Sequence, residues 1–175
     1  MFIPIFPLVA LTGLLLLATA GTAAETPAKA APAAAAFELR DQYETLHMIS
    51  FPTTNVTVMT VADRKGSEQI GGWIAPLKER YAGRIAIAGI ADMSQVPGLL
   101  RSMVQARFRK RYTYPVMLDW DGLVARGFHY QKDQANVFVI DGNGRVTGQF
   151  TGATNAVALK ALFTRVDLAL SKSTQ

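Results

Sequence analysis

The side chains best suited to chemistry follow the first two strands that the sequence predicts. Acidic, basic and amide groups gather there, where the chain passes from a strand into a helix. Because the carboxyl ends of parallel strands meet at one edge of an open α/β sheet, we expect these groups to lie close together. They are Asp63, Arg64, Lys65, Glu68, Gln69 and Asp92.

Three interpretations of this cluster are open. Asp63 and Asp92 could cap the helices that follow them, since a carboxylate accepts hydrogen bonds from free N–H groups at a helix start. Asp63, Glu68 and Asp92 could instead share a ligand or a metal ion, or serve as acid and base in an enzyme. Arg64 and Lys65, together with the free N–H groups, could hold an anion.

The composition excludes thiol chemistry. The 175 residues contain no cysteine, which rules out a disulfide, a dithiol redox motif, a cysteine nucleophile and a four-cysteine metal site. The two histidines, His47 and His129, leave little material for a metal cluster, and we expect both at the surface or at a helix cap. Ser50 and Ser67 have no evident base and acid relay, which argues against a serine hydrolase. We expect no metal and no cofactor.

Two short acidic segments look like ligand loops only superficially. Segment 119–122 (DWDG) starts like a calcium loop but lacks the further oxygen ligands and the closing glutamate, so we expect a turn and a helix cap. Segment 141–144 (DGNG) should form a hairpin turn between two strands. Trp73 and Trp120 are expected in the core.

A basic segment forms a second candidate surface. The chain has a net charge of +5, and residues 101–111 carry five positive charges and no negative one. On a helix these residues would form a solvated face, or would bind an acidic envelope protein or an anionic lipid surface. No zinc-finger or RNA-recognition motif is present, so nucleic acid is not expected. The positive residues are Arg101, Arg107, Arg109, Lys110 and Arg111.

Strands and helices alternate along the rest of the chain. Alternating β-branched residues or apolar runs predict the strands, and apolar residues at i, i+3 and i+4 predict the helices. The expected strands are 55–62, 84–91, 114–118, 136–141 and 145–150, after a short extended segment at 37–43. The expected helices are 66–81, 96–112, 123–128 and 156–170. This order predicts an α/β fold with a central mixed sheet and helices on both faces.

Each long helix has one apolar side, which should pack on the sheet. In helix 66–81, which Pro76 should kink, this side holds Ile70, Trp73, Ile74, Leu77 and Tyr81. In helix 96–112 it holds Leu99, Met103, Ala106 and Phe108, opposite the arginines. In helix 156–170 it holds Val157, Leu159, Leu162, Phe163, Val166 and Leu170.

Four local strings occur in a characteristic order. They are 37–42 (FELRDQ), 73–77 (WIAPL) followed by Glu79 and Tyr81, 114–119 (YPVMLD), and 138–141 (FVID) followed by Gly144 and Val146. Together they resemble the redoxin branch of the thioredoxin-like superfamily, which includes thioredoxins, peroxiredoxins and alkyl hydroperoxide reductases. The resemblance covers about residues 37 to 170 and implies a thioredoxin-like three-layer fold.

The resemblance also implies where a redox site would stand. Counted back from 74–76 (IAP), the reactive dithiol motif falls on 68–71 (EQIG), and the facing cis-proline falls on Ala135, where we expect a trans peptide bond. Without cysteines, we expect no thiol oxidoreductase or peroxidase activity. The emptied site is expected to bind a ligand or a partner. Its residues would be Asp63, Arg64, Lys65, Glu68, Gln69, Trp73, Asp92 and Ala135.

The N-terminal residues predict export. Residues 1–24 contain the apolar run 8–20 followed by small residues, which is typical of a signal peptide, and an uncleaved membrane anchor is the alternative. An Ala/Pro-rich tether (25–36), the domain (37–170) and a flexible tail (171–175) would follow. We therefore expect an extracytoplasmic or periplasmic protein that serves as a binding or assembly module of the cell envelope. An enzyme or a metal- or anion-binding protein that uses the acidic residues is the alternative.

Overall fold

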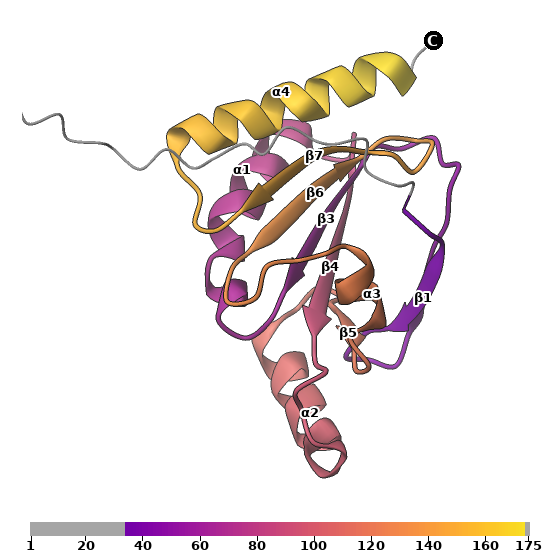
Figure 1. The fold of residues 1–175 in the computed structure, drawn as a ribbon, viewed down its shortest axis with the longest axis vertical. Helices are drawn as coiled ribbons and strands as arrows, with labels where there is room; N and C mark the ends of the chain where they lie inside the picture. The colour runs from indigo at the N-terminus through magenta and orange to yellow at the C-terminus, as the bar shows by residue number, and fades with distance from the viewer. Residues whose placement is uncertain (1–33, 174–175) are drawn as a thin grey trace, which may run out of the picture.

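The structure is a computed structural model that describes residues 34–173 (Figure 1), so the predicted leader and most of the predicted tether lie outside the described residues. The strands are β1 (Phe37–Arg40), β2 (Leu46–Ile49), β3 (Thr57–Ala62), β4 (Ala86–Asp92), β5 (Met117–Asp119), β6 (Asn136–Ile140) and β7 (Val146–Thr151). The helices are α1 (Ile70–Tyr81), α2 (Arg101–Arg111), α3 (Leu123–Gly127) and α4 (Ala156–Ser173), with short 3₁₀ turns η1 (Gly66–Glu68) and η2 (Gly98–Leu100). None of these helices is long and apolar enough to cross a membrane.

A mixed five-stranded sheet organises the fold, in the order β5-β4-β3-β6-β7. β3, β4 and β5 run parallel to one another, and β6 runs antiparallel to β3. β7 runs antiparallel to β6, as the hairpin turn at 141–144 predicts. All six residues of the central strand β3 are buried. The predicted α/β fold with a central mixed sheet is confirmed.

Helices α1 and α4 cover one face of the sheet with the apolar sides that their sequences predict. Trp73, Leu77 and Tyr81 of α1 are buried against Leu162 and Val166 of α4 and against β3, β6 and β7. Pro76 lies inside α1. Helix α4 continues to Ser173, beyond the predicted end at residue 170. Val157 is the exception on α4, because its side chain is 73% exposed.

The opposite face is covered by α3 and by a small hairpin of β1 and β2. Met59, Val61 and Phe138 form the core there, and Phe37 and Leu39 of β1 pack against it. Strand β2 was not predicted from the sequence, where only an extended segment at 37–43 was expected. Four residues with alternating exposure give a weak pattern, and the pairing depends on the turn that the Asp41 carboxylate holds by accepting hydrogen bonds from Tyr43 N and Thr45 N.

The predicted packing side of α2 is wrong for three of its four residues. No residue of α2 is buried, and Leu99, Met103 and Ala106 point to solvent. Of the predicted side, Phe108 does face the protein, and it packs together with Val104 on a third apolar cluster around Leu118, where Trp120 is only partly buried. Figure 1 shows α2 projecting away from the sheet. The helix carries two apolar stripes, and periodicity alone cannot say which of them packs.

Candidate functional site

Asp63 connects the two segments that enclose positions 68–71, where the resemblance to redoxins places a dithiol motif. One carboxylate oxygen accepts a hydrogen bond from Gly66 N at 2.9 Å, and the other accepts one from Asp133 N at 2.7 Å. Its carbonyl accepts a bond from Ser67 N at 2.9 Å. Asp63 therefore stabilises the start of η1, in keeping with the cap interpretation, and also holds the loop before β6.

Gln69 joins the same two segments from the helix side. Its side-chain oxygen accepts a bond from Ala135 N at 3.2 Å, and its side-chain nitrogen donates to Asp133 O at 3.4 Å. The backbone of Gly66 also packs tightly against the loop before β6, since a Cβ at this position would lie 2.2 Å from Gln134 O. Within residues 34–173 the one cis peptide bond is Phe51–Pro52, so the bond before Ala135 is trans as expected.

Two of the predicted site residues are closed off from any ligand. Trp73 is 1% exposed and donates from Nε1 to Gly152 O at 2.9 Å, while Ala135 is fully buried. The prediction that Trp73 and Ala135 bind a ligand is therefore wrong. Trp73 belongs to the core, as its other interpretation predicts.

Asp92 is held in a turn of its own. Its carboxylate accepts hydrogen bonds from Ser94 N at 2.9 Å and from the Tyr130 hydroxyl. Burial raises the pKa of Asp92, but these hydrogen bonds lower it by more, so the pKa of this carboxyl lies below its usual value. Burial and the bond to Asp92 raise the pKa of Tyr130. Asp92 thus caps no helix, and the prediction of a cap there is wrong.

The acidic residues do not converge on a metal. Among the described residues, no group of three or more acidic or histidine side chains has the geometry to hold an ion. The alternative of a metal site on Asp63, Glu68 and Asp92 is therefore not met. Asp63 and Asp92 already use their carboxylate oxygens within the fold.

A groove of about 650 Å³ runs between the start of α1 and α2. Its floor is low because small side chains face each other across two paired strands: Thr60 lies beside Gly89, and Ala62 beside Ala91. Glu68 and Gly71, the two positions at which the resemblance to redoxins places cysteines, line it. The other lining residues are Asp63, Arg64, Ser67, Ile70, Ile90, Met93, Val96, Val104, Arg107, Phe108, Arg111, Tyr112, Tyr114 and Val116.

The groove brings the two predicted surfaces together. Arg64 and Glu68 come from the acidic and basic cluster after the first predicted strand, and Arg107 and Arg111 come from the basic segment. Within residues 34–173 none of these four side chains has an ion-pair partner. The groove therefore presents three arginines against one glutamate that is free to pair.

The remaining basic residues lie elsewhere or are engaged. Lys65 pairs with Asp133 at 3.3 Å on the surface, and Arg101 lies 3.6 Å from Asp121. Arg109 donates from Nε to Gln42 O at 2.6 Å. Lys110 is exposed on the side of α2 away from the groove and does not line it.

One end of the groove is aromatic, which the sequence did not predict. The rings of Phe108 and Tyr112 are 5.3 Å apart, those of Tyr112 and Tyr114 are 5.6 Å apart, and Lys78 Nζ lies 4.7 Å from the Tyr114 ring centre. Buried Gln42 fixes this end by accepting a bond from Val116 N and donating to Tyr114 O, each at 2.8 Å. The YTY string after the basic segment was the available signal.

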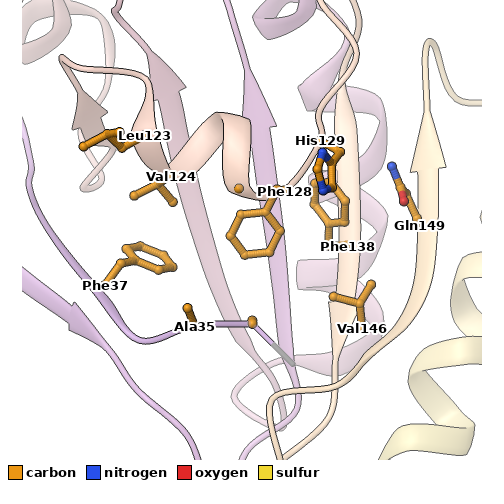
Figure 2. A pocket seen from close by; sticks show the side chains of 11 residues that line it. Ala35, Phe37, Leu123, Val124, Phe128, His129, Phe138, Val146 and Gln149 are labelled. Atoms are coloured by element: carbon orange, nitrogen blue, oxygen red, sulfur yellow. The ribbon is translucent and has the colours of Figure 1, made fainter. Parts of the chain in front are cut away.

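A second cavity of about 440 Å³ lies beside α3 (Figure 2). Phe37, Phe128 and Phe138 line it, with the polar side chains of His129 and Gln149. None of the predicted site residues lines this cavity. His129 is exposed, as expected.

Three further acidic residues, Asp119, Asp141 and Asp41, have structural roles. The Asp119 carboxylate accepts a bond from Ala125 N at 2.8 Å at the start of α3, and Asp141 accepts bonds within its hairpin turn, which confirms both predictions. His47 is partly exposed at the surface, as one of its two expected places requires, and its Nε2 lies 2.8 Å from the carboxylate of buried Asp41. Burial raises the pKa of Asp41, and the bonds from His47 and two backbone N–H groups lower it by more.

Comparison with known proteins identifies the architecture. No family model and no curated protein matches the sequence. A Chlorobium tepidum protein described as the thiol:disulfide interchange protein DsbE has a TM-score of 0.61 at 18% identity, over 81% of this chain and 98% of that one. The exposed lipoprotein thioredoxin of Streptococcus pneumoniae has a TM-score of 0.60 at 12% identity (76% and 99%), and peroxidoxin BcpB of Mycobacterium tuberculosis 0.52 at 20% (83% and 96%).

The chain has a thioredoxin-like fold. It has this fold without a cysteine anywhere in its sequence. The thioredoxin-like fold therefore supports an arginine-containing groove here, with Glu68 and Gly71 at the expected dithiol positions.

Proposed function

We propose that this thioredoxin-like protein is an exported binding module without thiol redox activity, which holds an acidic segment of an envelope partner in the groove. The observation that carries the proposal is the lining of the groove. It combines Glu68 and Gly71 at the expected cysteine positions with three arginines that have no ion-pair partner within residues 34–173. Dithiol exchange needs a thiolate nucleophile and a second thiol, and the chain has neither.

The lining indicates a partner of mixed chemistry. Guanidinium groups bind carboxylates through charge-assisted hydrogen bonds, so Arg64, Arg107 and Arg111 favour an acidic occupant. The small floor residues and the aromatic rings of Tyr112 and Tyr114 favour apolar side chains between the acids. An enzyme that uses Asp63 and Asp92 as acid and base is less well supported, because both carboxylates are engaged within the fold.

Export is supported by two separate observations. The apolar run 8–20 with small residues after it is typical of a signal peptide. One structural neighbour is described as an exposed lipoprotein thioredoxin. In the envelope, the groove would meet other exported proteins.

The binding proposal can be tested with a labelled peptide of alternating glutamate and leucine. It should bind the full chain at least tenfold more tightly than a lysine–leucine peptide of equal length. Arg107→Glu should weaken binding about tenfold or more, since a hydrogen bond to a charged group contributes about 1.5–3 kcal/mol. Lys110→Glu, on the same helix but outside the groove, is the matched control. Equal binding of both peptides, or equal loss in both variants, would contradict a groove site.

The absence of redox activity needs its own measurement. The pure chain should neither reduce insulin with dithiothreitol as electron donor nor consume peroxide above a heat-treated control. Thiol-dependent turnover by the chain would refute that part of the proposal.

A further inference from the structure

The outward side of η2 and α2 carries exposed apolar side chains. Leu99 is 96% exposed, Met103 45% and Leu100 42%. Leu99, Met103, Ala106 and Lys110 follow one another at spacings of four, three and four, so they lie along one side of the helical turn and helix. We call this side the outer stripe.

The outer stripe is separate from the groove. The groove is lined by Val104, Arg107, Phe108 and Arg111, which occupy a different side of the same helix. Figure 1 shows that α2 projects from the sheet. Within the described chain, no residue of α2 is buried, and Leu99 and Met103 are exposed.

The positive charge around the outer stripe limits which kind of partner can bind there. Helix α2 contains five basic residues and no acidic one, and Lys110 on the stripe has no ion-pair partner within residues 34–173. A second copy of the chain would bring two such helices together, and their like charges would repel. The occupant must therefore be anionic and must also accept exposed apolar side chains.

We propose that the outer stripe docks on the surface of an anionic lipid bilayer. Exposed Leu and Met side chains can be buried at the boundary of the bilayer, and neighbouring basic residues are attracted to anionic lipids. Leu99 and Met103 enter the boundary between headgroups and acyl chains, while Lys110 meets anionic headgroups. A bilayer is favoured over an acidic protein because it accommodates projecting side chains without a shaped pocket. The proposal is independent of the groove and its occupant.

The absence of cysteine allows a position-specific test. Met103→Cys in the full chain is labelled with a polarity-sensitive fluorophore and mixed with vesicles of phosphatidylglycerol and phosphatidylcholine in equal parts. The emission should shift to the blue and be quenched by spin-labelled lipid, and vesicles of phosphatidylcholine alone should produce neither change. Val157→Cys, on an exposed position of α4, should show neither change on either vesicle. This readout is local, so it is not confused with insertion of the apolar run 8–20.

Charge reversal supplies a second arm. Lys110→Glu should lower the affinity of the labelled position for anionic vesicles about tenfold or more, and Lys160→Glu on α4 should leave it unchanged. An unchanged spectrum at position 103 on anionic vesicles would overturn the proposal, as would equal shifts at positions 103 and 157. A shift produced by polyglutamate but not by vesicles would also overturn it, in favour of an acidic protein.

Discussion

Asp63 is the side chain whose removal should best reveal how the groove wall is held. Its two carboxylate oxygens accept hydrogen bonds from Gly66 N and Asp133 N, which belong to segments far apart in the sequence. Asp63→Ala leaves both N–H groups without this acceptor, and that of Gly66 belongs to a buried residue. The change therefore weakens the connection between η1 and the loop before β6.

The size of the effect follows from these two bonds. A hydrogen bond contributes about 0.5–1.5 kcal/mol net, and one to a charged acceptor contributes more when it is buried. Because Asp133 is exposed, we take about 1 kcal/mol for each bond, so Asp63→Ala should lower the free energy of unfolding by about 2 kcal/mol. Asp63→Asn keeps one acceptor oxygen and should lose about half as much.

Urea denaturation of the full chain, followed by tryptophan fluorescence, measures these differences. Glu68→Ala removes an equal charge from the same segment without removing a hydrogen bond, so it serves as the matched control and should change stability by less than about 0.5 kcal/mol. If Asp63→Ala were no more destabilising than Glu68→Ala, the connection through Asp63 would not contribute to stability and the reasoning would be wrong.

Two further predictions concern close packing and pH. Gly66→Ala should destabilise the fold by about 1–3 kcal/mol, because the new Cβ would lie 2.2 Å from Gln134 O, while Gly71→Ala, with no atom within 4 Å, should not destabilise it; equal midpoints of thermal unfolding would contradict this. The pKa of Asp41 is lowered in the fold, so its carboxylate contributes stability above its unfolded pKa, and this contribution is lost as the pH falls through the folded value. The stability advantage over Asp41→Asn should therefore shrink between about pH 5 and pH 1 in acid titrations monitored by circular dichroism, and a pH-independent difference would count against it.

The sheet and two of its helices could be predicted because the residues that favour each strand or helix locally are also the residues that pack in the core. Val58 and Val61 alternate in a strand that is buried on both faces, and Trp73 and Leu77 lie on the only broad apolar side of α1. The dithiol positions could also be assigned, since 74–76 fixes the count back to residue 68. In these elements, the apolar pattern of the sequence is compatible with a single packing arrangement.

The groove could not be predicted, because it depends on how far α2 stands from the sheet. Leu99 and Met103 form one apolar stripe and Val104 and Phe108 another, and only tertiary packing selects between them. The meeting of Arg107 with Glu68 follows from that selection and has no local signal in the sequence. The same limit explains the error at Asp92, whose partner Tyr130 lies 38 residues away.

At the paired small residues under the groove, the backbone holds the strands together and the side chains determine the shape of the groove floor. The pairing of β3 with β4 is made by backbone groups, so it does not depend on which side chains stand at Thr60, Ala62, Gly89 and Ala91. A Cβ added at Gly89 would meet Thr60 Oγ1 at 3.6 Å, an ordinary contact. Selection can therefore reshape the floor of this groove one methyl group at a time, and so change what it accepts, while the architecture beneath stays the same.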